Sequence, residues 1–139
     1  MNTLKLIKCA PLFLLACMGA AHADVVVVVS AQSKVATLTK DQVSELFLGG
    51  SKEFPGGGTA LLVSTTGPVR DEFYSKVLGK DPAQVKAVWS RLIFSGKGTA
   101  PREIGDVAEV KKLVSANPST IGFIDKSAVD ASVKVVYAP

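Results

Sequence analysis

A short polar segment, Thr65-Thr66-Gly67 followed by Arg70, offers the clearest chemistry in this sequence. It lies between an apolar run that predicts a strand and Pro68, a residue suited to the first turn of a helix. Free N–H groups at a helix N-terminus bind anions, and hydroxyls and an arginine beside them add further donors. A simpler interpretation, which the residues alone favour, is that a threonine caps the helix while Arg70 pairs with Asp71, Glu72 or solvent.

A second candidate is the glycine-rich basic loop at residues 95–99, which is followed by Arg102. It superficially resembles the phosphate loop of nucleotide-binding proteins. It departs from that pattern because it follows a predicted helix rather than a strand, and because Lys97 precedes Gly98 rather than serine or threonine. We expect a solvated connection between two elements; the alternative is a flexible basic loop that closes over an anion.

The composition excludes several classes of catalytic site. All the cysteine and histidine of the 139-residue chain lies in its first 23 residues, whose features predict removal. The remainder therefore lacks the residues for Cys–His or Ser–His–Asp catalysis, for common zinc sites and for disulfides. Its carboxylates show no spacing that singles out a catalytic pair. We expect a protein that is not an enzyme, with no catalytic residue, metal site or cofactor.

The charge of residues 24–139 is close to neutral, with 14 basic and 12 acidic side chains. The small basic excess is scattered along the chain and forms no cluster. Proteins that bind nucleic acid concentrate positive charge on one face. We therefore expect no nucleic-acid partner.

Residues 1–23 have the features of a secretory signal peptide. Lys5 and Lys8 precede a mostly apolar stretch at residues 11–19, and Ala21-His22-Ala23 is a cleavage signal. Cleavage there leaves one domain at residues 24–139. An alternative is lipid anchoring at Cys17, because residues 14–17 resemble a bacterial lipobox. Both alternatives predict export, and no later segment is long and apolar enough to cross a membrane.

Strand and helix patterns alternate along the rest of the chain and predict an α/β fold. We expect a layered sheet of about four to five mostly parallel strands flanked by helices. The five consecutive valines at residues 25–29 are typical of a strand buried on both faces, and we place it in the middle of the sheet. The other expected strands are residues 60–64, 121–124 and 133–137.

Helices are expected at residues 40–48, 68–78, 82–93 and 107–116, with Thr39, Asp81 and Asp106 as N-caps. The third of these has the clearest helical stripe of apolar residues. Because Trp89 and the nearby Phe94 are spaced like their apolar neighbours, we expect both to pack in the core or between helices.

Together these motifs resemble the phosphate-binding periplasmic proteins of bacterial ABC transporters, especially small single-domain phosphate ABC transporter substrate-binding proteins. The resemblance covers nearly all of residues 24–139, and its most specific parts are Leu-Thr-Lys-Asp-Gln … Phe-Leu-Gly at residues 38–49 and Thr-Ile-Gly-Phe-Ile at residues 120–124. It implies one lobe of a type II periplasmic binding protein, in which backbone amides, hydroxyls and an arginine at helix N-termini hold phosphate. It also implies a periplasmic location and an ABC permease as partner.

The sequence departs from this family in two respects. Full-length members close two lobes around the ligand, whereas residues 24–139 supply about one lobe. Their binding turn typically reads Ser-Gly-Thr-Arg, and the aligned positions here are Gly67-Pro68-Val69-Arg70. The arginine is kept, but two hydroxyls are lost and Pro68 removes one N–H donor. Thr65 and Thr66 are placed to substitute in part.

The resemblance therefore implies an exported solute-binding module for phosphate or a similar tetrahedral oxyanion, associated with ABC-type phosphate uptake. Its ligand-binding residues would be Thr65, Thr66, Gly67 and Arg70. A half-site open to water has weak charge contacts, so tight binding needs a second lobe, from a partner or a homodimer. The alternative function is a ligand-free periplasmic protein-interaction or accessory module that kept the fold of the lobe.

Overall fold

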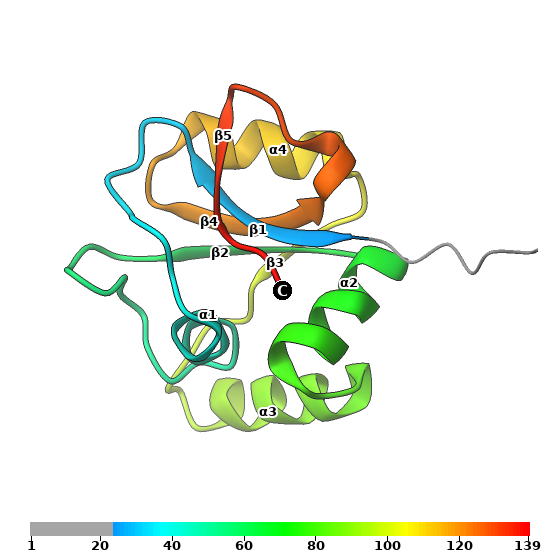
Figure 1. The fold of residues 1–139 in the computed structure, drawn as a ribbon. Helices are drawn as coiled ribbons and strands as arrows, with labels where there is room; N and C mark the ends of the chain where they lie inside the picture. The colour runs from blue at the N-terminus through cyan, green and yellow to red at the C-terminus, as the bar shows by residue number, and fades with distance from the viewer. Residues whose placement is uncertain (1–23) are drawn as a thin grey trace, which may run out of the picture.

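The computed structural model describes residues 24–139, which form one five-stranded sheet in the order β3-β2-β4-β1-β5 (Figure 1). The predicted signal peptide, its cleavage site and Cys17 lie outside the described residues. The strands are β1 (Val25–Ser30), β2 (Leu61–Thr65), β3 (Arg102–Ile104), β4 (Thr120–Asp125) and β5 (Val133–Tyr137).

The sheet is mixed. Strand β2 pairs in parallel with β3 and β4, whereas β1 pairs antiparallel with both β4 and β5. Four of the five strands in the described part therefore run in one direction and β1 runs in the other. The prediction of an α/β fold with four to five mostly parallel strands flanked by helices is confirmed, although half of the pairings are antiparallel.

The valine run is the most completely buried strand. All six residues of β1 are buried. Val26 and Val28 pack toward α4 (Val107–Ala116), while Val25, Val27 and Val29 belong to the larger core on the opposite face. The prediction of a strand buried on both faces is confirmed, because one core cluster covers each face of β1. The middle position of the sheet, however, belongs to β4.

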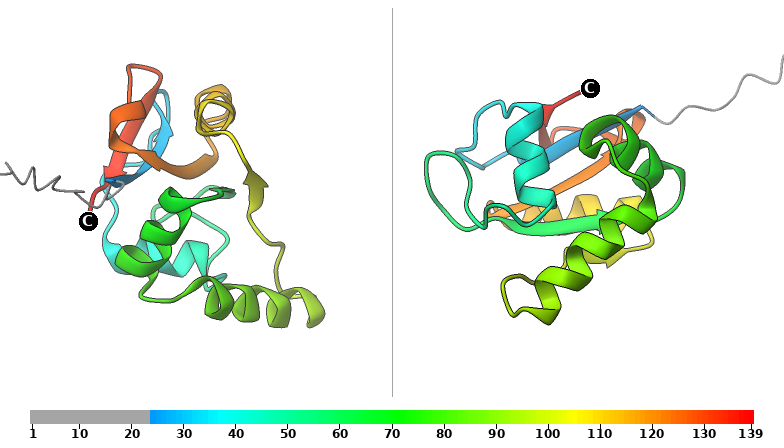
Figure 2. Two further views of the ribbon diagram at one scale, coloured as in Figure 1. Left: turned by 90° about the vertical axis from the view of Figure 1, so that its right-hand side faces the viewer. Right: turned by 90° about the horizontal axis from the view of Figure 1, so that it is seen from below.

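Helices cover both faces of the sheet. Helices α1 (Lys40–Phe47), α2 (Pro68–Phe73) and α3 (Pro82–Phe94) lie on one face, and α4 lies on the other (Figures 1 and 2). The rings of Phe73 and Phe123 stack with their centroids 4.0 Å apart, and Phe47 packs edge-on against both. This aromatic cluster joins α1 and α2 to β4.

The predicted helix starts are confirmed. The Thr39 hydroxyl accepts a hydrogen bond from Gln42 N–H at 3.2 Å, and the Gln42 side chain accepts one from Thr39 N–H at 2.9 Å. Asp81 and Gln84 form the same reciprocal capping box at 2.8 and 2.9 Å. Asp106 caps α4 with its side chain.

The helix predicted from Pro68 is present but changes its winding. After α2 the chain continues as a π-helix over Tyr74–Leu78, and it ends at Gly79, whose φ of 62° is in the left-handed region. Phe73 and Val77 keep the predicted apolar face, with exposed fractions of 0% and 1%.

Two predictions along residues 90–104 are wrong. Strand β3 occupies Arg102–Ile104, where we expected no element, because three residues with two charges show no apolar pattern and the strand forms only by pairing with β2. Phe94 does not pack: its side chain is 96% exposed and Ile93 is 52% exposed. The last turn of α3 extends beyond the sheet (Figure 2), which agrees with the exposure of these two side chains.

Trp89 packs as predicted. Its indole Nε1–H donates to the Phe47 carbonyl at 2.9 Å, and its side chain is buried. This hydrogen bond links the middle of α3 to the end of α1. It therefore fixes the position of α3 on the face of the sheet that also carries α2.

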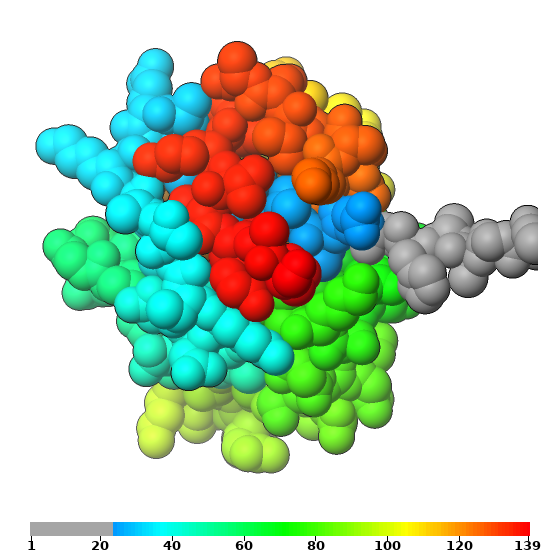
Figure 3. Space-filling model, viewed as in Figure 1, coloured from blue at the N-terminus to red at the C-terminus, as the bar shows by residue number. Residues whose placement is uncertain are grey.

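The C-terminal strand β5 forms one edge of the sheet and is partly covered. Leu38 N–H donates to the Val136 carbonyl at 2.8 Å, and the Lys134 ammonium donates to the Ser33 carbonyl at 2.8 Å. Figure 3 shows the C-terminal segment, in red, packed beside the segment that leads into α1, in cyan. Among residues 24–139, no helix combines the length and apolar character needed to cross a membrane.

Candidate functional site

The predicted anion turn joins the end of β2 to the start of α2. Gly67 is the N-cap of α2 and has a φ of 76°, a conformation that favours glycine. No side chain caps the helix, so neither Thr65 nor Thr66 has the capping role of the simpler interpretation. Asp71 N–H donates to the Gly67 carbonyl, but Val69 N–H and Arg70 N–H have no backbone acceptor within residues 24–139. Two N–H donors at this helix end therefore remain available.

Thr65 is an unusual residue at this turn. Its side chain is fully buried and its hydroxyl Oγ1 has no hydrogen-bond partner in the described part of the chain. Because side chains alternate along a strand and Val63 packs in the α4 cluster, Thr65 points toward the α4 face of the sheet. An unpaired buried hydroxyl costs stability, so it marks a position where a ligand or water would contribute a hydrogen bond.

Thr66 lies beside the end of β3. Its hydroxyl is 3.9 Å from the position that a Cβ atom would take at Gly105, the residue that follows β3. The parallel pairing of Thr65 with Ile104 brings these two strand ends together. The edge where β2 and β3 end thus carries two threonines, and the lack of a side chain at Gly105 leaves space there.

Arg70 is held by its neighbours. Its guanidinium donates to the Asp71 carboxylate from Nε at 3.2 Å and from Nη2 at 3.1 Å, and lies 5.9 Å from the centroid of the Tyr74 ring. Its side chain is 27% exposed. The interpretation in which Arg70 pairs with Asp71 therefore matches the structure. Glu72 instead pairs with Lys76 at 2.9 Å.

Arg70 also lines a cavity of about 480 Å³ between β2, α2 and α3. Of the four predicted ligand residues, Arg70 lines this cavity and Thr65, Thr66 and Gly67 do not. The polar and charged residues around it are Ser64, Arg70, Tyr74, Lys86 and Glu103. Sequence reasoning missed Ser64 and Lys86, although the alternation of β2 places Ser64 on the face opposite Thr65.

The carboxylates near the C-terminal ends of β2 and β4 disfavour the binding of an anion. Strand β4, parallel to β2, ends there in Asp125, and the hydroxyl and the N–H of Ser127 both donate to that carboxylate, at 2.6 and 2.8 Å. These hydrogen bonds lower the pKa of Asp125 below its usual value, so it stays ionised. An anion at the turn would therefore be repelled by the negative charges of Asp71 and Asp125, while the N–H groups of Val69 and Arg70 attract it.

The basic residue of the glycine-rich loop, Lys97, is not part of the Arg70 cavity, although Ala100 and Pro101, which follow the loop, line it. Residues 95–101 connect α3 to β3, with Gly96 at a φ of 70° and Lys97 N–H donating to the Leu92 carbonyl. Lys97 is exposed and does not line the Arg70 cavity. Residues 95–97 are exposed, as expected for a solvated connection, whereas Gly98 and Thr99 line a second cavity beside β2.

Comparisons with known proteins place the fold. No protein-family model and no curated protein matches the chain. Solved structures do match over 82% of its length. One from Clostridium perfringens, assigned as a phosphate ABC transporter substrate-binding protein and solved with bound phosphate, has 21% identity and a TM-score of 0.65. An ABC-type phosphate transport receptor from Vibrio cholerae has 18% identity and a TM-score of 0.60, and PstS from Borrelia burgdorferi has 11% and 0.59.

The chain spans less than half of each of these structures, namely 44%, 45% and 46% of their lengths. The mixed sheet with helices on both faces corresponds to one of their two halves. The expected resemblance is therefore confirmed at the level of fold: the chain has the fold of one lobe of the phosphate ABC transporter substrate-binding proteins.

Proposed function

We propose that this protein is an exported, periplasmic solute-binding module for phosphate or a similar tetrahedral oxyanion, and that it works with an ABC-type phosphate uptake system. The observation that carries the proposal is the uncapped start of α2, where Val69 N–H and Arg70 N–H have no backbone acceptor. A tetrahedral oxyanion accepts hydrogen bonds in several directions and suits such a helix end. The shared fold with phosphate-binding proteins supports the choice of ligand.

The proposed ligand-binding residues are Gly67 and Arg70 with the hydroxyls of Thr65 and Thr66. Arg70 needs little rearrangement, because a guanidinium has five N–H donors and Asp71 occupies two of them. Thr65 contributes a hydroxyl that lacks a partner. Thr65 and Arg70 point to opposite faces of the sheet, so the oxyanion would lie at the strand end between them.

Affinity in a single lobe should be low. The turn faces solvent, Gly67 is exposed and Arg70 is partly exposed, so the charge contacts act in a high dielectric. We propose that a second lobe, supplied by a permease-associated partner or by a second copy of the chain, completes the site. The chain spans about half the length of the structures it resembles.

Calorimetric titration with phosphate, with sulfate as comparison, tests the function. The wild-type protein should bind phosphate and Arg70→Ala should lose that binding, because the substitution removes the only arginine at the turn. The matched control is Arg91→Ala, an exposed arginine on α3 that lies outside the Arg70 cavity. Equal phosphate affinity in the wild type and Arg70→Ala would exclude the proposed site.

A second candidate function is a ligand-free interaction or accessory module. It is favoured by Ile93 and Phe94, two adjacent exposed apolar side chains at the end of α3, because aromatic and apolar side chains are enriched at protein–protein interfaces. Light scattering across a concentration series, with Phe94→Ser as the variant, tests for self-association through this end. A monomer at every concentration in both proteins would exclude a homodimer at this surface.

A further inference from the structure

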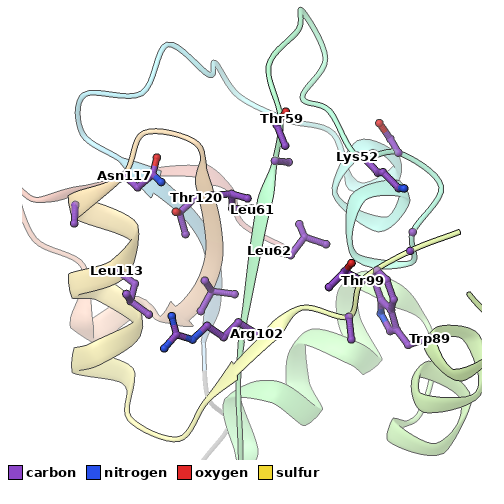
Figure 4. A pocket seen from close by; sticks show the side chains of 17 residues that line it. Lys52, Thr59, Leu61, Leu62, Trp89, Thr99, Arg102, Leu113, Asn117 and Thr120 are labelled. Atoms are coloured by element: carbon purple, nitrogen blue, oxygen red, sulfur yellow. The ribbon is translucent and has the colours of Figure 1, made fainter. Parts of the chain in front are cut away.

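A second cavity, of about 550 Å³, lies beside the first half of β2 (Figure 4). Its wall is mainly apolar and includes Leu61, Leu62, Val63, Trp89, Leu113 and Ala116, with several hydroxyl side chains and the Asn117 amide among them. Trp89 comes from α3 and Leu113 from α4, which lie on opposite faces of the sheet, so the cavity reaches around the edge of β2. Apolar cavities of this size with a few polar groups typically bind small organic molecules.

The cavity exists because the outer edge of β2 is interrupted. Pairing with β3 begins only at Val63, opposite Arg102. Before Leu62 in the chain, Ala60 N–H donates to the Lys52 carbonyl at 2.9 Å. Leu62 lies between these two contacts. Since Leu61 N–H donates to Ser119 on the β4 side, Leu62 N–H points to the outer edge, where no backbone acceptor within residues 24–139 meets it.

The charged groups in the cavity wall have one sign. They are Lys52 and Arg102, and neither forms an ion pair within residues 24–139, while no carboxylate from that range lines the cavity. Figure 4 shows the two side chains well apart, with Leu62 between them, Trp89 on the Lys52 side and Leu113 on the far side of Arg102. The Leu62 N–H adds a neutral donor. An occupant with an apolar body and an acidic group would complement all three features.

We infer that this cavity binds a small amphipathic carboxylate, such as a medium-chain fatty acid or an aryl-substituted acid. The apolar body lies against Leu61, Leu113 and Trp89, and the carboxylate contacts Arg102 or Lys52. This site is separate from the proposed oxyanion turn, because Thr65, Thr66, Gly67 and Arg70 do not line the cavity. The inference therefore stands or falls independently of phosphate binding.

Titration of the purified protein with octanoate, below its micellar concentration, tests the site directly. Trp89 is the only tryptophan and lines the cavity, so its fluorescence should change in a saturable way, with calorimetry as the second readout. Octylamine and octanol have the same chain without the negative charge. Octanoate should bind more tightly than octylamine by about tenfold or more, and hexanoate should bind about tenfold more weakly than octanoate because it buries two fewer methylenes.

Substitutions in the wall distinguish the site from general surface binding. Leu61 is 47% exposed, so Leu61→Glu should fold normally while its carboxylate repels octanoate, and octanoate binding should fall by about tenfold or more. Val135→Glu is the matched control, since Val135 is a 39% exposed strand residue on the opposite edge of the sheet. Arg102→Gln should weaken octanoate and leave octanol unchanged, with Lys112→Gln on the exposed face of α4 as its control.

The octanoate titration is repeated in the presence of phosphate. This control is needed because Trp89 lines both this cavity and the one beside Arg70, so its fluorescence could respond to either ligand. Octanoate binding should be the same with and without phosphate, and Arg70→Ala should keep it. Three results would overturn the inference: no saturable response to millimolar octanoate by either readout, equal affinity for octanoate, octanol and octylamine, or unchanged octanoate affinity in Leu61→Glu. The inference would also be overturned if the protein were a dimer that has to dissociate before octanoate binds. The cavity would then be occupied by a second copy of the chain.

Discussion

Arg70 donates two hydrogen bonds to a single carboxylate oxygen of its sequence neighbour Asp71, from Nε at 3.2 Å and from Nη2 at 3.1 Å. The two residues form the first turn of α2, where negative charge is favourable for the helix. The same carboxylate competes with any anion for the guanidinium. The balance between Asp71 and a bound oxyanion should therefore set the affinity of the turn.

Replacing Asp71 by asparagine should raise phosphate affinity. The variant frees the Arg70 guanidinium and removes one negative charge beside the site, and for a partly exposed pair we expect a gain of about two- to fivefold. Calorimetric titration at low ionic strength measures it. Asp41→Asn, an exposed carboxylate in the first turn of α1, is the control and should leave the affinity unchanged. A lower affinity in Asp71→Asn would mean that the carboxylate positions Arg70 rather than competing for it.

Thr65→Val should separate stability from ligand binding. Valine has nearly the same shape and removes a buried hydroxyl that has no partner, so the free energy of unfolding without ligand should stay equal or rise by up to about 2 kcal/mol. If the hydroxyl binds the oxyanion, phosphate affinity should fall in the same variant. Urea unfolding and phosphate titration give the two values. A clear loss of stability would show that the Thr65 hydroxyl is paired in solution.

The fold could be anticipated from sequence wherever a local signal determines the element. Five consecutive valines suffice to place β1 in the interior of the sheet, and the Thr39–Gln42 capping box marks the start of α1. Strand β3 has no such signal, because Arg102–Ile104 is extended only through its pairing with β2. The spacing of Phe94 predicts packing in the core or between helices, but spacing does not show where the neighbouring elements end.

The site was harder to predict than the fold for a related reason. Thr65 and Arg70 are five residues apart, and their proximity in sequence indicated a single cluster. In the structure, Thr65 points to the face of the sheet that α4 covers. Arg70 lines a cavity on the opposite face, together with Ser64. Side-chain alternation in β2 places Ser64 and Thr65 on opposite faces, but the face on which α2 and Arg70 pack depends on tertiary structure.

Trp89→Phe should destabilise the protein. The change removes the hydrogen bond to the Phe47 carbonyl and part of a buried ring, so we expect a loss of about 2–4 kcal/mol in the free energy of unfolding. Urea unfolding followed by circular dichroism is the measurement, because the variant has no tryptophan. Phe94→Ala, at a side chain that is 96% exposed, should change stability by less than about 0.5 kcal/mol. Similar losses in both variants would contradict the packing described for α3.

The stability of the folded state should fall in acid, and Asp130 should contribute to that fall. The Lys111 ammonium at 2.8 Å and the Ser132 hydroxyl and N–H lower the pKa of Asp130 in the folded state. A lowered folded-state pKa stabilises the protein above the unfolded value of 3.8, and this contribution is lost as the pH falls below that value toward the folded pKa. Unfolding in urea at pH 7, 5 and 3 should show a shallower decline for Asp130→Asn than for the wild type. Glu53→Gln, at an exposed carboxylate outside the helices with no ion pair within residues 24–139, should follow the wild-type curve; identical curves for all three proteins would exclude the Asp130 contribution.

The most direct test of the proposed function is a phosphate titration followed residue by residue with ¹H–¹⁵N correlation spectra of the protein. The account predicts that the largest amide shifts occur at Gly67, Val69 and Arg70, because free N–H groups there would donate to the oxyanion. The Leu62 amide beside the second cavity should not move. Shifts concentrated elsewhere, or none at millimolar phosphate, would contradict the assignment of the start of α2 as the oxyanion site.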